Sequence, residues 1–141
     1  MTKIFFDTNV ILDALTERDQ DYKPAQKLIR LVASGSMKGY ISAKQITDIY
    51  YILRKYCSEE IQRKAIIETI INTFEVIPTL KSDIQYCLKS DIHDLEDALI
   101  DEACKVNYIN YLVTNNVEDF RKGKSTVFTP NQLITILEID Q

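Results

Sequence analysis

Short apolar runs alternate with longer amphipathic segments along this chain, and this alternation constrains the possible fold more than any other sequence feature. The runs at Lys3–Phe6 and Tyr111–Thr114 are four residues long, as buried strands often are. The segments between such runs carry apolar residues at helical spacing, most clearly in the segment that follows Asp94. Strands that alternate with helices in this way predict an α/β domain with a mostly parallel sheet.

The individual elements are predicted from the same patterns and from turn and capping residues. We expect strands at Lys3–Phe6, Lys38–Ile41, Glu75–Ile77, Tyr111–Thr114 and Val127–Phe128. We expect helices over Val10–Leu15, Pro24–Ala33 and Lys81–Lys89, and further helices after Ser42, Ser58, Asp94 and Thr129. Ser42 is a candidate cap, and capping boxes are expected at Ser58 and at Thr129 with Gln132.

The length and composition fit one ordinary globular domain. The chain has 141 residues, of which 45% are hydrophobic and 27% are charged, and this composition excludes disorder and low complexity. No apolar run approaches the roughly 20 residues that span a bilayer, and residues 1–15 lack a signal-peptide pattern. We therefore expect a single domain over residues 1–141 in a soluble, cytoplasmic protein that does not associate with membranes.

The side chains available for catalysis exclude several chemistries. Cys57, Cys87 and Cys104 are widely spaced and form no zinc-ligand motif, and His93 is the single histidine. A structural zinc, a disulfide framework and a Ser-His-Asp triad are therefore not expected. The net charge of −4 argues mildly against binding to nucleic acid. It does not decide the question, because carboxylates around a divalent cation form a locally positive site once the cation is bound.

Acidic and amide side chains follow several of the expected strands or open the helices beside them. The working crevice of a parallel α/β sheet lies beyond the carboxyl ends of its strands, so we expect these side chains to converge. Oxygen donors suit a hard cation such as Mg²⁺, which can activate water for attack on a phosphodiester without a His, Cys or Ser nucleophile. The residues concerned are Asp7, Thr8, Asn9, Asp48, Asp94, Glu96, Asp97, Thr114, Asn115, Asn116 and Asp119.

Each acid also has a purely structural interpretation. Asp94 and Asp97 suit the N-cap and N3 positions of their helix without any metal. Asp7 between a strand and a helix can form an ordinary turn or cap. Asp48 lies opposite the apolar stripe of its helix and beside Lys44, where a solvated side chain is the usual outcome. No single acid is decisive.

A short basic cluster follows the acids near the fourth expected strand. It consists of Arg121, Lys122 and Lys124. Loop cations are usually only solvated, but next to a phosphodiester-cleaving site they can contact the nucleic-acid backbone. Both interpretations of this cluster stay open.

Three motifs of the chain together carry a family resemblance. They are Phe6–Asp13 (FDTNVILD), Asp94–Leu99 (DLEDAL) and Leu112–Phe120 (LVTNNVEDF). In this order they resemble the motifs of PIN-domain nucleases, the family that includes VapC-type toxins, and Thr129–Pro130 resembles a recurrent ending of that family. The resemblance covers the whole chain. It implies a PIN-like three-layer α/β sandwich with a central, mostly parallel sheet of four or five strands flanked by helices.

The resemblance also assigns roles to individual residues. Asp7 and Asp97 would be the principal ligands of Mg²⁺, with Mn²⁺ as an alternative ion. Asp48 stands where the family usually has Glu, and Asn116 stands where many members have a fourth acid, with Asp119 nearby. The catalytic set would therefore be Asp7, Asp48, Asp97 and Asp119. Residues that orient these acids or contact substrate would be Thr8, Asn9, Asp94, Thr114 and Asn116, and contacts to the RNA backbone would come from Arg121, Lys122 and Lys124.

The function implied by the resemblance is Mg²⁺-dependent endonucleolytic hydrolysis of RNA, as by the toxin of a type II toxin–antitoxin pair. It further implies a cognate antitoxin protein and a homodimer. The departures at Asp48 and Asn116 leave open a weak or inactive PIN-fold module that binds RNA or protein. A third alternative is Mg²⁺-dependent phosphotransfer through an aspartyl phosphate at Asp7. It is disfavoured because Ile77–Thr79 supplies no acid and no second acid stands two residues after Asp7.

Overall fold

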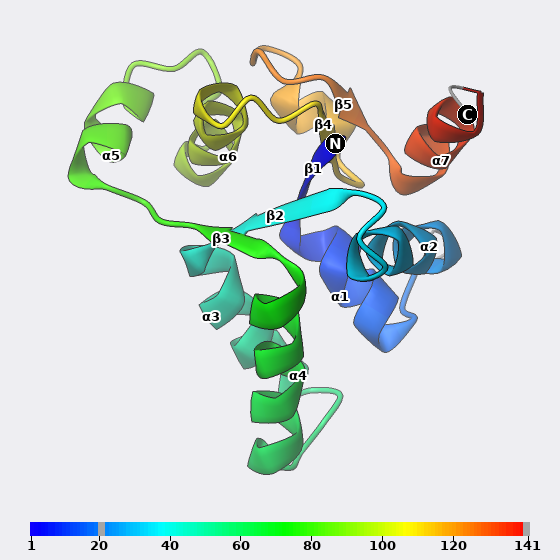
Figure 1. Cartoon of the computed structure of the whole chain (residues 1–141). Coiled ribbons are helices and arrows are strands. Elements are labelled where there is room, and N and C mark those ends of the chain that lie inside the picture. Colours follow the sequence, from blue (N-terminus) through cyan, green and yellow to red (C-terminus); the bar gives the residue numbers. More distant parts are fainter. Residues whose placement is uncertain (20–21, 140–141) are drawn as a thin grey trace.

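The computed structural model describes residues 1–19 and 22–139, and within them five strands form one parallel sheet in the order β3-β2-β1-β4-β5 (Figure 1). The strands are β1 (Lys3–Phe6), β2 (Lys38–Ser42), β3 (Glu75–Ile77), β4 (Tyr111–Val113) and β5 (Val127–Phe128). The helices are α1 (Thr8–Thr16), α2 (Tyr22–Ala33), α3 (Ala43–Leu53), α4 (Glu60–Thr73), α5 (Lys81–Cys87), α6 (Leu95–Val106) and α7 (Pro130–Ile139), with a 3₁₀ turn η1 (Val117–Phe120).

Helices cover both faces of the sheet, and the side-chain alternation of the strands feeds two separate cores. Ile4 and Phe6 of β1 pack into a core with α1, α2, α3, α4 and α7. Phe5, between them, packs on the opposite face with α5, α6 and η1. Figure 1 shows α5 and α6 on one side of the sheet and α1 to α4 on the other. The predicted three-layer α/β architecture with a parallel sheet is therefore confirmed.

Most predicted element positions are confirmed to within a few residues. All five expected strands are present, and the helix after Asp94 has Asp94 as its N-cap. Thr129 and Gln132 form the expected capping box, since the Thr129 amide donates to Gln132 Oε1 at 3.0 Å and the Gln132 amide donates to Thr129 Oγ1 at 3.2 Å. No helix among the described residues is both long and apolar enough to cross a membrane.

The capping box predicted at Ser58 is wrong. Helix α4 begins at Glu60 with Glu59 at its N-cap position, and no side chain caps it. Instead, the guanidinium of Arg63 donates from Nη1 to the carbonyl oxygens of Cys57 and Ser58 at 2.9 and 2.8 Å. These bonds use the carbonyls before the helix, and the loop leading into α4 is held by a side chain that lies within the helix itself.

A buried glutamine joins the start of α3 to the end of β1. Gln45 is 1% exposed. Its Nε2 donates to the carbonyl oxygen of Phe6 at 2.8 Å, and its Oε1 accepts from the Ser42 amide at 2.6 Å. Because Phe6 immediately precedes Asp7, this side chain fixes α3 against the strand end from which the predicted site begins.

We predict that Gln45→Ala lowers the free energy of unfolding by about 1–3 kcal/mol, because it leaves the buried carbonyl of Phe6 and the amide of Ser42 without these partners. Urea unfolding followed by circular dichroism measures this effect. Gln85→Ala, at an exposed position of α5, is the matched control and should change stability little. Equal stability of the two variants would contradict the role of Gln45.

Candidate active site

The predicted site residues meet where the strand order reverses. From β1 the chain moves outward through β2 and β3, and then returns to β4 on the other side of β1. In open α/β sheets such a reversal leaves a crevice beyond the carboxyl ends of the strands, where ligands bind. Asp7 follows β1 and Asn116 follows β4, and the first turn of α6 supplies Asp97 at the same edge.

An open pocket of about 360 Å³ lies in this crevice. The four acids predicted as the catalytic set all line it, although α6 and η1 bring two of them from far along the chain. Four of the predicted accessory residues line it as well. The predicted residues around the pocket are Asp7, Thr8, Asn9, Asp48, Asp94, Asp97, Asn116 and Asp119, and Tyr51, Ile52 and Glu96 complete its wall.

Asp7 is the most tightly held of these acids. Its Oδ1 accepts from the Thr8 amide at 2.8 Å, and its Oδ2 accepts from Thr114 Oγ1 at 2.7 Å. The amide of Asp7 donates to the carbonyl oxygen of Val113 at 3.0 Å, which joins the ends of β1 and β4. Burial raises the pKa of Asp7, these two hydrogen bonds to its carboxylate oppose the rise, and the charges of Glu96 and Asp119 add to it.

Among the acids of the pocket, Asp97 has the most strongly raised pKa. It lies in the first turn of α6, where its amide donates to Asp94 Oδ1 at 3.0 Å. Desolvation raises the pKa of Asp97 to about 7, and the charges of Asp94, Asp7, Asp119 and Glu96 contribute to the rise. Carboxylates that perturb one another in this way concentrate negative charge, which a divalent cation would neutralise.

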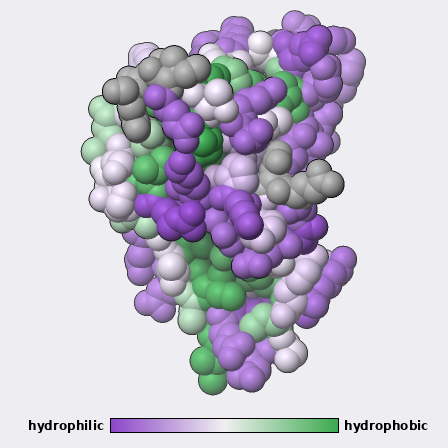
Figure 2. Space-filling model, turned by 90° about the vertical axis from the view of Figure 1, so that its right-hand side faces the viewer, coloured by the Kyte–Doolittle hydropathy of each residue, from purple (hydrophilic) through white to green (hydrophobic). Residues whose placement is uncertain are grey.

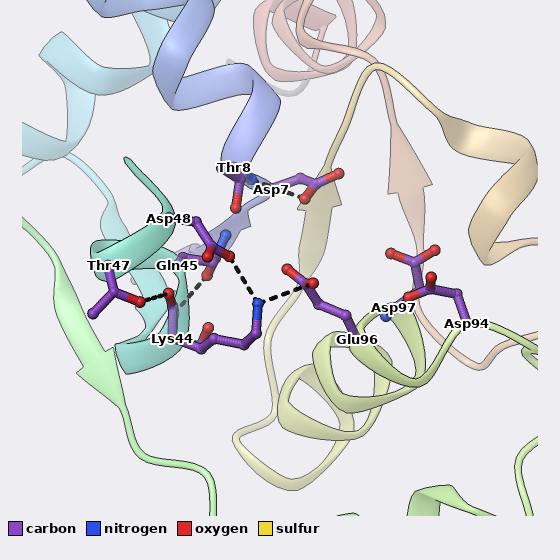
Figure 3. A network of polar contacts seen from close by, with 10 residues as sticks. Asp7, Thr8, Lys44, Gln45, Thr47, Asp48, Asp94, Glu96 and Asp97 are labelled. Carbon is purple, nitrogen blue, oxygen red and sulfur yellow. Dashed lines mark hydrogen bonds and ion pairs between the residues drawn. The ribbon is translucent and has the colours of Figure 1, made fainter. Parts of the chain in front are cut away.

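Asp48 and Glu96 have a cation partner instead. The ammonium nitrogen of Lys44 lies 2.9 Å from Asp48 Oδ2 and 3.2 Å from Glu96 Oε2. Figure 3 shows Lys44 between these two carboxylates, with Asp94 and Asp97 on the other side of Glu96 in this view. The expectation that Asp48 lies beside Lys44 is confirmed, but its side chain is only half exposed and borders the pocket.

The donor set fits a Mg²⁺-like ion in chemistry, although it is not arranged as a closed cage. Among the described residues, no group of three or more His, Cys, Asp or Glu side chains is positioned to hold a metal together. A closed cage is not required, because Mg²⁺ keeps several water ligands and takes one or two carboxylates. Asp7 and Asp97 supply oxygen donors that no protein cation pairs within the described residues, and they are the pair that fits such an ion.

The predicted basic residues line two neighbouring hollows. Arg121 and Lys122 line a hollow next to the acidic pocket, and that hollow also includes Asp94, Asp97 and Asp119. Lys124 lines a different hollow, which Lys122 also borders and which includes neither Asp97 nor Asp119. Its backbone amide donates to both carboxylate oxygens of Asp101, at 3.0 and 3.1 Å.

The sequence analysis did not identify a buried carboxylate whose hydrogen bonds join residues next to the site. Asp13 in α1 is 2% exposed, and it accepts hydrogen bonds from Arg18 Nε at 2.7 Å and from Asn115 Nδ2 at 2.6 Å. Arg18 also donates from Nη2 to Asn9 Oδ1 at 3.2 Å. This network connects α1 to the segment after β4. The available signal was an acid between Leu12 and Ala14 in an otherwise apolar stretch of helix.

We predict that, without divalent ions, the protein loses stability as the pH rises. The folded-state pKa of Asp97, about 7, lies above the usual value of 3.8. The protonated form therefore favours folding below about pH 4, and this contribution is lost as the pH rises through about 7. After allowance for solvent screening of a partly exposed group, we expect a loss on the order of 1 kcal/mol.

Urea unfolding in a chelator at pH 5 and pH 8 measures this loss. Asp97→Asn should remove most of it, whereas Glu68→Gln, at an exposed position of α4, should keep it. An identical pH dependence in wild type and Asp97→Asn would contradict the prediction.

We predict that Thr114→Val weakens divalent-cation binding by about 10- to 100-fold, because the hydroxyl that orients Asp7 is lost. Thr114 is fully buried and valine has nearly the same shape, so the fold should persist. Calorimetric titration with Mn²⁺ measures the affinity, and Thr114→Ser, which keeps the hydroxyl, is the control. Wild-type affinity in Thr114→Val would show that Asp7 does not depend on this bond.

Comparisons with known proteins identify the family and the fold. The family model described as PIN domain matches residues 3–118. Ribonuclease VapC1 of Aquifex aeolicus is 28% identical over 142 residues, covering 92% of each chain. VapBC2 of Rickettsia felis, solved bound to promoter DNA, has a TM-score of 0.67 at 18% identity and covers 91% of this chain and 98% of that chain.

A toxin–antitoxin complex from Klebsiella pneumoniae has a TM-score of 0.66 at 21% identity, and covers 90% of this chain and 97% of that chain. At these identities the structural likenesses show the fold alone. The family match extends over most of the chain and includes two of the three acidic motifs in full and most of the third. This protein belongs to the PIN domain family.

Proposed function

We propose that this protein is a metal-dependent endoribonuclease and the toxin of a toxin–antitoxin pair. The observation that carries the proposal is the acidic pocket, where Asp7 and Asp97 lie among further carboxylates without a cation partner from the described residues. The relative named Ribonuclease VapC1 supports RNA as the substrate. The toxin–antitoxin complex from Klebsiella pneumoniae supports a cognate antitoxin as the partner.

The proposed cofactor is Mg²⁺, with Mn²⁺ as an alternative, held by Asp7 and Asp97. Such an ion would lower the pKa of a water molecule and stabilise negative charge on the reacting phosphate. Thr8 and Thr114 hold the carboxylate of Asp7 in a fixed orientation through two hydrogen bonds. Asp119, whose charge acts on both Asp7 and Asp97, is the better candidate for the fourth acidic position, because Asn116 is uncharged.

The substrate would approach over the neighbouring hollow. Arg121 and Lys122 line it beside Asp94, Asp97 and Asp119, so their cationic groups suit phosphates that flank the scissile bond. Arg121 is also paired with Glu118, and this pair would have to open for Arg121 to bind phosphate. Lys124 is less well placed, because its hollow does not reach the acids of the pocket.

Exposed apolar side chains support the proposal of protein partners, namely the antitoxin and a second copy of this chain. On the α3–α4 arm, Tyr51, Tyr56, Ile61 and Ile71 are 65%, 51%, 83% and 46% exposed. Figure 2, which looks from the side of α2 and α7, shows hydrophobic side chains in the lower half of this face and others at its left edge and near its top. Contiguous apolar surface is typical of interfaces, and these side chains are the candidates to form one.

We predict that Asp7→Asn reduces RNA cleavage by at least about 100-fold, because the loss of one carboxylate ligand weakens the stabilisation of the transition state. Asparagine can still accept from the Thr8 amide through its oxygen and can donate from its nitrogen to the Thr114 hydroxyl, so the fold should be retained. The measurement is cleavage of a mixed-sequence single-stranded RNA with Mg²⁺ or Mn²⁺, and Glu68→Gln, at an exposed position of α4, is the control.

Three results would contradict the proposed role of Asp7. Wild-type cleavage rates in Asp7→Asn would mean that another group does the chemistry. If wild type bound RNA without cutting it, with either ion, the inactive binding module would be the better description. A phosphoryl group covalently attached to Asp7 after incubation with a phosphodonor would favour the phosphotransfer alternative.

A further inference from the structure

The acidic pocket is divided into two parts with different charge balance. Among the described residues, Asp7, Asp94 and Asp97 form no ion pair, so no ammonium or guanidinium group neutralises them at close range. Asp48 and Glu96 both pair with a single lysine, Lys44. Within the described part of the chain, the same pocket therefore contains a side without an ion pair and a side that already has a paired cation.

The position of Lys44 follows from two helices that meet at this edge of the sheet. Lys44 and Asp48 are one helical turn apart on α3, which places their side chains on the same face. Glu96 comes from the first turn of α6, 52 residues further along the chain than Lys44. The ammonium group lies within 3.2 Å of both carboxylates and so connects the two helices across the rim of the pocket.

A divalent ion on this side would have to displace Lys44. Both pairs are partly exposed, with side-chain exposures of 54% for Lys44, 37% for Asp48 and 43% for Glu96, so each pair alone is weak. Displacement costs both pairs at once. The freed ammonium group would also remain tethered close to the entering ion and would repel it.

We infer that Lys44 acts as a built-in cation on the Asp48–Glu96 side, so that the pocket binds one divalent ion, on the Asp7–Asp97 side. This inference rests on the proposed metal site and specifies how many ions that site takes. Lys44 therefore determines metal stoichiometry. Asp48, in turn, contributes to the pocket mainly as the partner of Lys44.

The test is a calorimetric titration of the full chain with Mn²⁺, which counts bound ions independently of RNA cleavage. Wild type should bind one ion per chain. Lys44→Gln should bind two, with affinity for the second ion at least about tenfold higher than any second event in wild type. Lys44→Arg, which keeps a positive charge beside Asp48 and Glu96, should again bind one.

Lys64→Gln is the matched control. Lys64 pairs with Glu60 one helical turn away on α4, at 2.7 Å, with both side chains well exposed and neither in the pocket. Its loss should leave the count at one, whereas a general effect of removing a lysine would raise the count in both variants.

The outcomes separate this inference from the proposed function. Two ions in wild type, or one ion in Lys44→Gln, would overturn the role of Lys44 and leave the metal-dependent nuclease standing. No Mn²⁺ bound by wild type at millimolar concentration would overturn the metal dependence itself, and the role of Lys44 with it.

Discussion

The convergence of like charges at one edge of the parallel sheet is the constraint on which the rest of this structure depends. Parallel strands bring their carboxyl ends together, and the reversal of strand order beside β1 leaves room there for a pocket. Acidic side chains line this pocket. They lower the free energy of unfolding, because their charges repel one another and are partly desolvated. The pKa of about 7 at Asp97 is the clearest sign of this cost.

The surrounding side chains limit this cost unequally, and the inequality supports the proposal that the metal ion binds on the side of Asp7. Asp7 receives hydrogen bonds from Thr8 and Thr114 but no positively charged partner from residues 1–19 and 22–139, whereas Asp48 and Glu96 receive the ammonium group of Lys44. Hydrogen bonds orient a carboxylate without neutralising it. Asp7 is thus held in place and left available for a cation, as a metal-dependent phosphodiesterase requires.

The fold and the meeting of most of the acids at one pocket could be predicted from local patterns, whereas Asp48 was expected there only from the family resemblance. The apolar run before Asp7 and the capped helix after Asp94 fix where each acid stands on its element, and the topology of a parallel sheet does the rest. Pairings between distant side chains have no such local pattern. The bridge from Lys44 to Glu96 and the bond from Asn115 to Asp13 depend on how α3, α6 and α1 pack, and neither could be predicted. At Ser58 the local pattern itself misled, because Arg63 binds the preceding carbonyl groups.

The central claim is that Asp7 and Asp97, 90 residues apart in the sequence, together bind a divalent ion. Anomalous diffraction from crystals soaked in Mn²⁺ tests it most directly, because it locates the ion regardless of what the protein cleaves. The account predicts an anomalous peak in the pocket between these two carboxylates, with each of them bound to the ion directly or through one water. A peak that contacts neither carboxylate would contradict the account. So would a crystal soaked in saturating Mn²⁺ that shows no ion in the pocket.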